Sequence, residues 1–344
     1  MRIALVAPVE EPIPPRTYGG IERVVHLLDS ALADRGHEVV LLASGGSESH
    51  GRLLPLTDAP ITAEGRDLDP EDVVHKKESA ARMAAQLLPD LGIDVVLNHS
   101  WRLIDHLDPL PCPVLTTVHY PLDRDPYRSM FLSRSQATYV SISWSQQRAL
   151  DSLRFAGNVY NGIDLNALPF SARSDGYLAF LGRVSPDKGL DLAIRAAREV
   201  GLPILVAAKL DGIHRGWFDA VIAPLLRSDG VELIGEVNAA ERAELLGGAI
   251  ALLHPSRWSE PFGLAAVEAM ACGTPVVALR RGAADEVIDH GTSGIVVDDE
   301  DELAGGVRRA LLLDRVACRA HVASRFTHVR MAAEYEELAF RIAR

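Results

Sequence analysis

The sequence has few cysteines, little positive charge and no long apolar run, and each shortage excludes a class of protein. Its three cysteines, Cys112, Cys272 and Cys318, are far apart and form no C-x-x-C pair. A disulfide framework or a zinc site is therefore not expected, and a reducing compartment is. The net charge of −12 argues against a general nucleic-acid binder, because such proteins carry net basic charge. We therefore expect a cytoplasmic protein that binds no nucleic acid.

Membrane segments are also missing. No apolar run in the sequence reaches the roughly 18 residues that a membrane-spanning helix needs. The chain starts with a short apolar run followed by acids, which indicates a buried strand and not a signal peptide. Six basic residues that could face a membrane are scattered among acids, which indicates a solvated surface: Lys76, Lys77, Arg82, Arg124, Arg128 and Arg134. Peripheral contact with the inner face of a membrane is left open.

Several catalytic motifs are absent as well. The sequence has no G-x-G-x-x-G, G-x-x-x-x-G-K-[ST], G-x-S-x-G or H-E-x-x-H, which disfavours dinucleotide, P-loop, α/β-hydrolase and zinc-protease chemistry. Asp123-Arg124-Asp125 is a D-x-D string, of the kind that can hold a metal on a nucleotide-sugar diphosphate. It lacks a second carboxylate cluster, so we interpret it as a solvated loop and predict no metal site.

What the sequence does contain is an alternation of short apolar runs and amphipathic segments. Its 344 residues correspond to two domains at roughly 150 residues each. Such runs are typical of parallel strands buried on both faces. We predict strands at residues 3–7, 39–43, 95–98, 114–118, 139–142, 177–181, 204–208, 231–234, 250–254, 276–279 and 295–297. Helices are predicted at residues 21–35, 72–88, 144–153, 190–199, 217–226, 239–246, 262–271, 302–313 and 328–344.

The order of these segments predicts an α/β protein of two doubly wound, Rossmann-like domains that face each other across a cleft. The break is expected in the turn-rich segment 164–176, which lacks a helical pattern. We therefore place the first domain at residues 1–168 and the second at residues 169–327. The charged helix 328–344 could cap either domain. Ligands of such sheets bind beyond the carboxyl ends of the strands, so the cleft is the expected site.

One candidate site is the segment from Ser259 to Leu264. Pro261 suits the first turn of a helix, which would place Glu260 at the helix entrance and Glu268 inside it. Free backbone N–H groups of the first turn would then form an anion site. Eight residues rise about 12 Å along a helix, so the two carboxylates would contact different parts of one elongated ligand. The alternative is structural, with Glu260 as a cap and Glu268 in solvent.

A second candidate follows the predicted strand 177–181 and runs from Gly182 to Gly189. Arg183 and Lys188 would stand at the carboxyl end of that strand, where two cations could hold a diphosphate. They could also stabilise charge that grows on a leaving phosphate. The alternative is an ordinary turn with two solvated cations.

Two weaker candidates lie in the first half of the chain. Gly19 and Gly20 precede the first predicted helix, and paired glycines allow the backbone to approach a ligand closely. His119 follows the predicted strand 114–118, so it would face the cleft and could donate a hydrogen bond to a sugar hydroxyl. His99 has a similar place after the strand 95–98. The alternatives are a plain loop and two structural histidines.

In combination, these segments resemble one family. The string from Ser256 to Ile288, SRWSEPFGLAAVEAMACGTPVVALRRGAADEVI, resembles the signature of family 4 retaining glycosyltransferases, which have the GT-B fold. The spacing of Glu260 and Glu268 matches that signature. GRVSPDKG resembles the family's phosphate-binding turn, and YGGIERVV resembles its first glycine loop. The resemblance covers nearly the whole chain.

The resemblance implies how the donor would be bound. Arg183 and Lys188 would bind its diphosphate, and Gly19 and Gly20 would approach the diphosphate from the opposite domain. Glu268 would accept hydrogen bonds from the ribose hydroxyls. The nucleotide base would rest against the backbone of three residues: Gly235, Glu236 and Val237.

The same resemblance implies the position of the transferred sugar. Glu260 would hold the sugar near its 3-hydroxyl, and His119 would lie near its 6-hydroxyl and anomeric carbon. Three backbone N–H groups would contact the phosphate or the sugar, those of Phe262, Gly263 and Leu264. The catalytic residues would be His119, Glu260, Arg183 and Lys188, without a metal or another cofactor.

The implied reaction is transfer of a glycosyl group from a nucleotide-diphospho-sugar to a hydroxyl acceptor, with retention of anomeric configuration. The first domain would bind the acceptor and the second the donor, and the helix 328–344 would cross back to the first domain. The segment from Gly282 to Glu286 departs from many relatives, because it has no proline before the glutamate.

Other functions of the same fold stay open at this point. They are a sugar-nucleotide epimerase, a phosphorylase, and a non-catalytic module that senses a nucleotide sugar. The sequence does not indicate the nucleotide, the sugar or the oligomeric state. The acceptor could be a growing polysaccharide, a lipid-linked sugar or a small natural product.

Overall fold

The computed structural model describes residues 1–64, 69–107 and 110–343. The chain divides into two compact units. Unit 1 consists of Met1–Gly162 together with His328–Arg344, and unit 2 consists of Ile163–Thr327. The division therefore lies a few residues before the boundary expected after residue 168.

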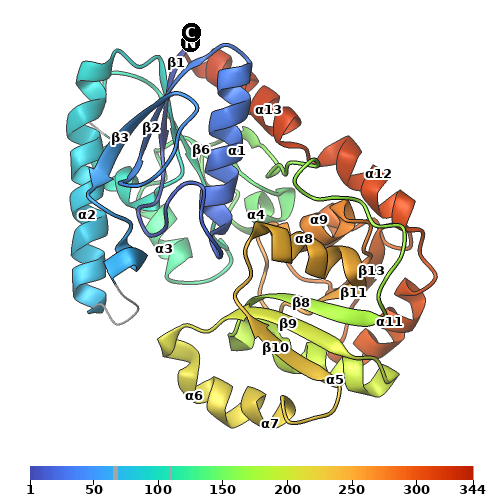
Figure 1. The fold of residues 1–344 in the computed structure, drawn as a ribbon. Helices are drawn as coiled ribbons and strands as arrows, with labels where there is room; N and C mark the ends of the chain where they lie inside the picture. Colours follow the sequence, from blue (N-terminus) through green and yellow to red (C-terminus); the bar gives the residue numbers. More distant parts are fainter. Residues whose placement is uncertain (65–68, 108–109, 344) are drawn as a thin grey trace. The chain divides into compact units, whose positions relative to one another are not determined.

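Unit 1 is built on a seven-stranded sheet in the order β3-β2-β1-β4-β5-β6-β7 (Figure 1). All its strand pairs are parallel. The strands are β1 (Arg2–Val6), β2 (Glu38–Ser44), β3 (Arg52–Thr57), β4 (Val95–Asn98), β5 (Val114–Thr117), β6 (Tyr139–Ser141) and β7 (Phe155–Asn158). Because β1, β4 and β5 are neighbours, the loops that follow them meet at one edge of the sheet.

Helices cover both faces of this sheet (Figure 1). They are α1 (Gly20–Asp34), α2 (Pro70–Leu87), α3 (Tyr127–Leu132), α4 (Trp144–Ala149) and α13 (His328–Ile342). The α2 side chains Ala80 and Ala84 pack with Val6 and Val96 in one core. α13 packs against α1, and its Tyr335 hydroxyl lies 2.8 Å from Thr117 Oγ1 at the end of β5. The last described helix therefore completes the first unit.

Unit 2 repeats the plan with a six-stranded parallel sheet in the order β10-β9-β8-β11-β12-β13. The strands are β8 (Tyr177–Arg183), β9 (Ile204–Lys209), β10 (Val231–Gly235), β11 (Ala249–His254), β12 (Val276–Leu279) and β13 (Gly294–Val297). The helices are α5 (Leu190–Val200), α6 (Arg215–Trp217), α7 (Ala223–Leu225), α8 (Ala239–Gly248), α9 (Leu264–Ala271), α10 (Ala284–Val287), α11 (Leu303–Ala310) and α12 (Arg315–Arg325).

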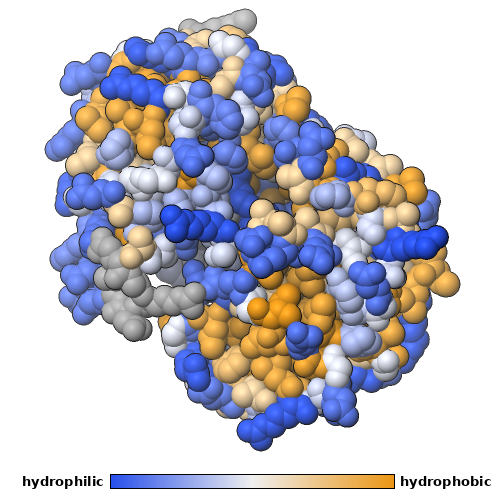
Figure 2. Space-filling view, viewed as in Figure 1, coloured by the Kyte–Doolittle hydropathy of each residue, from blue (hydrophilic) through white to orange (hydrophobic). Residues whose placement is uncertain are grey.

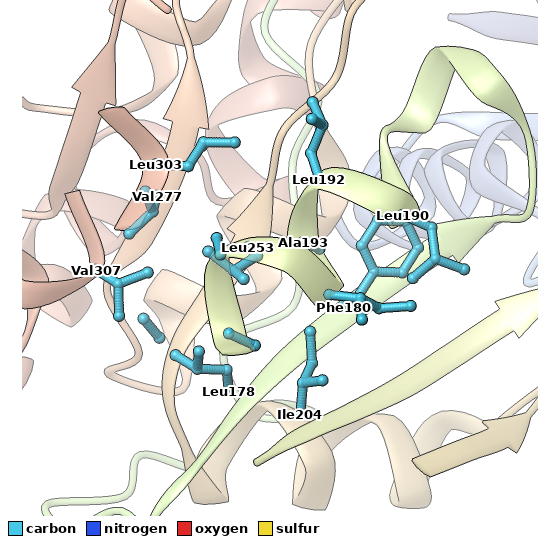
Figure 3. Close-up of a cluster of buried hydrophobic side chains, with 14 of the residues drawn as sticks. Leu178, Phe180, Leu190, Leu192, Ala193, Ile204, Leu253, Val277, Leu303 and Val307 are labelled. Atoms are coloured by element: carbon cyan, nitrogen blue, oxygen red, sulfur yellow. The ribbon is translucent and has the colours of Figure 1, made fainter. Parts of the chain in front are cut away.

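The core of unit 2 lies between the sheet and the helices α5 and α11. Figure 3 shows Leu190 and Ala193 of α5 close to strand side chains such as Phe180. Val277 of β12 and Val307 of α11 extend the same cluster. The apolar strand runs thus supply a core that continues from β9 to β13.

The sheet edges differ from the prediction. β3, β7 and the helix α12 were not predicted, and Pro55 inside β3 is a residue that a sheet tolerates only at its edge. β10 was predicted as a strand buried on both faces, but its Leu233 and Ile234 are each 38% exposed. Figure 2 shows hydrophobic residues at the surface over β8, β9 and β10. An apolar run predicts the strand, but an edge position leaves part of it uncovered.

Two predicted helices are also corrected. The helix expected at 217–226 is divided into α6, a π-helical turn at Phe218–Ile222, and α7, because Pro224 has no N–H for the regular ladder. The helix expected to include Pro261 begins only at Leu264. No helix in the described parts of the chain is both long and apolar enough to cross a membrane.

Candidate functional site

Two loops of unit 2 bring Lys188 and Glu260 together. Lys188 ends the short turn Pro186–Lys188 that follows β8, and Glu260 follows β11. β8 and β11 are parallel neighbours, so the loops after them share one edge of the sheet. The Lys188 ammonium forms an ion pair with the Glu260 carboxylate. Their side chains are only 14% and 15% exposed, so Lys188 is not the solvated cation of the alternative interpretation.

Several donors converge on one oxygen of Glu260. Oε2 accepts a hydrogen bond from Trp258 Nε1 at 2.7 Å and from Ser256 Oγ at 3.3 Å, besides the contact with Lys188. Burial alone would raise the pKa of Glu260, but attraction to Lys188 and the hydrogen bonds lower it to about 2. Oε1 accepts no hydrogen bond from any residue that the structure describes. An ionised carboxylate therefore has one oxygen available for a ligand hydroxyl.

His254 is the last residue of β11, and its Nε2 lies 4.0 Å from Glu260 Oε2. Burial lowers the pKa of His254 to about 4, so the ring is neutral at pH 7. Nε2 is buried and has no hydrogen-bond partner within the described ranges. His254, Glu260 and Phe262 line a cavity of unit 2. The sequence analysis did not select His254, although its place at the carboxyl end of a predicted strand was a usable signal.

The two loops are tied together by Arg257. Its guanidinium donates to both carboxylate oxygens of Asp191, at 2.8 and 2.9 Å, and to Glu300 at 2.8 Å. Its backbone N–H donates to the carbonyl oxygen of Asp187 at 2.7 Å. These bonds hold the turn that carries Lys188 against the loop that carries Glu260. Sequence reasoning also missed this residue.

A close backbone approach supports Glu260 from the other side. Gly282 has a φ of +57°, and a Cβ at this position would lie 2.2 Å from the carbonyl oxygen of Glu260. The N–H of Ala283 donates to that oxygen at 2.9 Å. The segment that lacks the proline of many relatives therefore still braces the Glu260 loop, and glycine is required at its start.

Arg183 differs from Lys188 in its partners. It is the last residue of β8, and its Nε is buried without a hydrogen-bond partner. No ion pair connects its guanidinium with another of the residues that the structure places. Lys188 is neutralised by Glu260, so Arg183 supplies a positive charge that this edge of the sheet does not cancel.

The helix after Glu260 starts later than predicted. Its N-cap is Gly263, with a φ of +93°, and Leu264 is its first residue. Glu260 and Pro261 therefore lie in the preceding loop, and the N–H groups of Phe262 and Gly263 do not belong to the first helical turn as expected. The Phe262 ring packs edge-on against Phe326 at 5.6 Å, so its side chain belongs to the core.

The remaining predicted residues of unit 2 lie near the ends of α9 and β10. Glu268 is buried within α9, and its Oε1 lies 3.5 Å from Arg242 Nε. The alternative of a solvated Glu268 is therefore wrong. Gly235 ends β10 with a φ of +82°, Glu236 is half-buried and Val237 is buried.

The predicted residues of unit 1 lie at the carboxyl edge of its own sheet. Gly19 is the N-cap of α1, and a Cβ there would lie 2.6 Å from Pro15 Cβ; Gly20 opens the helix. His119 Nε2 lies 2.9 Å from His99 Nδ1. Burial lowers the pKa of His119 to about 3. The two histidines that sequence analysis considered singly thus form a neutral pair.

One carboxylate of the D-x-D string is hydrogen-bonded within the chain. Asp125 accepts hydrogen bonds from the N–H and the hydroxyl of Ser129, at 3.0 and 2.6 Å, beside α3. No group of three or more His, Cys, Asp or Glu side chains suited to a metal occurs among the residues with described positions.

Comparison with known proteins identifies the family. The description "Glycosyl transferases group 1" matches residues 170–323, and "Glycosyltransferase Family 4" matches residues 18–167. The chain is a family 4 glycosyltransferase. The two matches meet close to the division between the units, so each unit carries one half of the family pattern.

Individual relatives agree with this assignment. The chain is 28% identical to glycogen synthase of Mycobacterium tuberculosis, over 87% of this chain and 84% of that protein. It is 27% identical to phosphatidyl-myo-inositol mannosyltransferase of Mycolicibacterium smegmatis, over 89% and 84%. An Anabaena protein crystallised with UDP-glucose has the same fold, with a TM-score of 0.74, 18% identity, and coverage of 99% and 100%. The fold is that of GT-B glycosyltransferases, and the protein is an enzyme of glycosyl transfer.

Proposed function

We propose that the protein transfers a sugar from a nucleotide-diphospho-sugar to a hydroxyl acceptor, with retention of configuration and without a metal. The observation that carries this proposal is the largely buried Lys188–Glu260 pair together with the uncancelled charge of Arg183. A diphosphate leaving group needs cations where its charge grows, and an ionised carboxylate is a strong hydrogen-bond acceptor for a sugar hydroxyl.

The roles follow from the charges. Arg183 and Lys188 bind the donor diphosphate and stabilise the negative charge that develops as the anomeric C–O bond lengthens. Glu260 accepts a hydrogen bond from a hydroxyl of the transferred sugar through Oε1. Glu268 binds the ribose, and the base lies against the backbone of Gly235, Glu236 and Val237. Backbone N–H groups of Phe262, Gly263 and Leu264 contact the phosphate or the sugar.

The chemical step needs no enzyme nucleophile. The bond between the anomeric carbon and the phosphate oxygen breaks, and the acceptor oxygen bonds to the same face of that carbon. The acceptor proton passes to the departing phosphate oxygen, so charge and atoms balance. Lys188 already neutralises the Glu260 carboxylate, which is consistent with a role in holding the sugar and not in attacking it.

Unit 1 supplies the acceptor side in this proposal. His119 stands at the carboxyl end of β5, where its neutral ring donates or accepts a hydrogen bond near the reacting sugar. Gly19 and Gly20 bring the start of α1 to the diphosphate. The glycogen synthase and the phosphatidyl-myo-inositol mannosyltransferase differ in activity, although their identities to this chain are nearly the same. Overall sequence similarity therefore does not indicate the acceptor.

A thermal-shift panel tests donor binding. UDP, GDP, ADP and dTDP and their sugars are added with and without EDTA, since a ligand of the folded state raises the melting temperature. UDP-glucose is the first donor to try, because the Anabaena structure was determined with it. A shift unaffected by EDTA supports the proposal, whereas a shift abolished by EDTA contradicts metal independence.

Turnover of the identified donor with and without acceptor then separates transfer from epimerisation, phosphorolysis and simple binding. The anomeric configuration of the product, read from its NMR couplings, decides between retention and inversion.

Arg183→Ala and Lys188→Ala should both weaken binding of the nucleoside diphosphate far more than binding of the free nucleoside. If affinity for both ligands fell equally, Arg183 and Lys188 would not contact the phosphates.

A further inference from the structure

A second cavity lies within unit 1, and its lining includes none of the residues assigned above. It opens where the loops after β1, β4 and β5 meet, and α2 forms one wall. Its polar and aromatic lining consists of Glu10, Lys77, Ser100, Trp101, Arg102 and Tyr120. This edge of a parallel sheet is where such sheets bind ligands.

Within the described part of the chain, Arg102 supplies this cavity with an unpaired positive charge and an unsatisfied hydrogen-bond donor. It lies in the short helix Trp101–His106 that follows β4, and its guanidinium carbon is 3.8 Å from the centre of the Trp101 ring. Its Nε is buried and unsatisfied, and no carboxylate pairs with it in the described ranges of the chain. Leaving part of a charged group buried without a hydrogen bond is costly, and an oxygen atom of a ligand at this position would satisfy it.

The stacking contact also prepares the guanidinium for a particular kind of ligand. With one face over an indole ring, the group has fewer rotamers open to it, and its N–H donors remain at its edge. Arginine binds phosphate and carboxylate groups through two such parallel donors. The guanidinium of Arg102 is therefore better suited to bind an oxyanion than a neutral hydroxyl.

The neighbouring charges leave that of Arg102 uncancelled. Glu10 Oε1 lies 2.5 Å from Lys77 Nζ, so these two opposite charges balance each other. The Tyr120 ring stacks on Tyr127 at 4.6 Å between centres, and burial raises the pKa of Tyr120 well above its ordinary value. Its phenol stays protonated and is a neutral hydrogen-bond donor. The charged residues that line the cavity, Glu10, Lys77 and Arg102, thus sum to one positive charge, in a chain whose net charge is −12.

We propose that this cavity binds an oxyanion, a phosphate or a carboxylate, that is part of the acceptor. The inference rests on the proposed function, in which unit 1 takes the acceptor. It narrows the acceptor to a negatively charged molecule, such as a sugar phosphate, a uronic acid or the headgroup of an anionic lipid. Lys77, which the sequence analysis treated as part of a solvated surface, lies at this site.

Binding of small probes tests the inference on the full chain. The protein is first saturated with the nucleoside diphosphate found in the thermal-shift panel, which occupies the phosphate-binding residues of unit 2. Dissociation constants are then measured by calorimetry for glucose 6-phosphate, glucuronate and neutral glucose. We expect at least one anionic probe to bind and glucose to bind roughly tenfold more weakly or not at all.

Substitutions assign the binding to Arg102. Arg102→Gln should weaken binding of the anionic probe roughly 10- to 100-fold, because it removes a charge-assisted pair of hydrogen bonds. Arg102→Lys keeps the charge without the fork and should lose less. Arg82→Gln, which removes an exposed arginine of α2, is the matched control and should bind as wild type does.

Several results would overturn the inference. They are equal affinity of wild type and Arg102→Gln, equal affinity for glucose and its phosphate, or binding of no anionic probe. If Arg102→Gln fails to fold, Arg102→Lys decides, and an unchanged affinity contradicts the assignment. The thermal shift of the wild type with nucleotides is read separately. If no nucleotide binds, the proposed function is refuted, and the anionic probes are titrated against the protein without nucleotide, so that the site is still tested.

A final comparison distinguishes the source of the anion. Sedimentation with vesicles of phosphatidylcholine, with and without phosphatidylinositol, is measured for wild type and Arg102→Gln. Binding that needs both phosphatidylinositol and Arg102 indicates a lipid headgroup. Binding of glucose 6-phosphate or glucuronate without vesicle binding indicates a soluble acceptor. Binding to none of these surfaces or probes overturns the site.

Discussion

At Glu260, burial and charge act in opposite directions on one carboxyl group. The nearby ammonium of Lys188 and the Trp258 N–H decide the outcome in favour of the ionised form. Lys188 in turn lies 4.8 Å over the Trp258 ring, so the pair and the indole form one cluster. Either charge would be costly to bury alone, so the loss of Lys188 or Glu260 would destabilise the cluster.

The charge of Glu260 can be removed while its shape is kept. Glu260→Gln should lower kcat/KM about 100-fold or more, because it removes an ionised acceptor at the transferred sugar and leaves Lys188 unpaired. Steady-state rates with the identified donor check this. Glu232→Gln, on the exposed strand β10, is the control and should retain full activity; a similar small effect for both would exclude a role for Glu260.

Two largely enclosed histidines, His254 and His119, make the stability of the protein depend on pH in the acidic range. The pKa of His254 is near 4 in the fold and 6.5 in ordinary surroundings, so the unfolded chain binds the proton more readily. Its stabilising contribution is therefore present above pH 6.5 and is lost as pH falls towards 4. His119, with a pKa of about 3, acts in the same direction.

Melting temperatures measured from pH 7 to pH 4 should therefore fall in the wild type. His254→Gln should show a shallower fall over this range. His75→Gln, which replaces an exposed histidine of α2, should follow the wild-type curve. A pH profile of His254→Gln as steep as that of the wild type would contradict the burial argument.

At the scale of elements, the site depends on loops that approach each other closely. Gly282→Ala places a methyl group 2.2 Å from the Glu260 carbonyl oxygen and forces a side chain into a φ of +57°. Strain of this kind costs about 1–3 kcal/mol, and the clash must also move the Glu260 loop. We expect a lower melting temperature together with weakened donor binding.

Gly291→Ala separates these two effects. Gly291 also has a positive φ, of +85°, but nothing lies within 4 Å of its missing Cβ. It should show the backbone strain without the loss of donor binding. Equal donor affinity in both variants, measured by calorimetry, would mean that the 282 segment does not position Glu260.

Buried elements were the most predictable part of the fold. β4 and β12 have the bounds that the apolar runs predicted, 95–98 and 276–279, because both strands are covered on each face. β3 and β7 were missed because edge strands need no continuous apolar run. The start of α9 was misplaced because Pro261 suggested a first turn, whereas the left-handed Gly263 delays the helix to Leu264.

The candidate site divides in the same way. The motifs selected Lys188 and Glu260, and the structure brings these two together. His254, Trp258 and Arg257 were not selected, because their contacts depend on how two loops meet beyond β8 and β11. Spacing along the sequence carries no information about such a meeting. The roles of all these residues in catalysis stay predictions.

At the scale of the whole molecule, unit 1 is made from both ends of the described chain. Leu338 of α13 is 4% exposed, and its Cδ2 would lie 3.1 Å from a Cβ at Gly157 of β7. Leu338→Ala should reduce the free energy of unfolding of this unit by about 2–5 kcal/mol, as cavities in a core do. Val329→Ala, on the exposed side of the same helix, should have little effect.

Hydrogen exchange read by mass spectrometry locates the change. Peptides from residues 1–162 should exchange faster in Leu338→Ala, and peptides from unit 2 should keep their wild-type rates. The nucleotide-dependent thermal shift should also persist, because the residues assigned to the donor phosphate lie in unit 2. Faster exchange spread evenly over both units would contradict this division.

The position of α13 also affects how the protein is made. Ribosomes add about 5–20 residues per second, so synthesis of Ile163–Thr327 takes on the order of 10–30 s. During that interval the first unit has left the ribosome without its last helix, and the surface of α1 that α13 will cover is open to water. The second unit has all its segments before the first one does. The amino-terminal half of this enzyme is therefore the part that most needs protection by chaperones during translation.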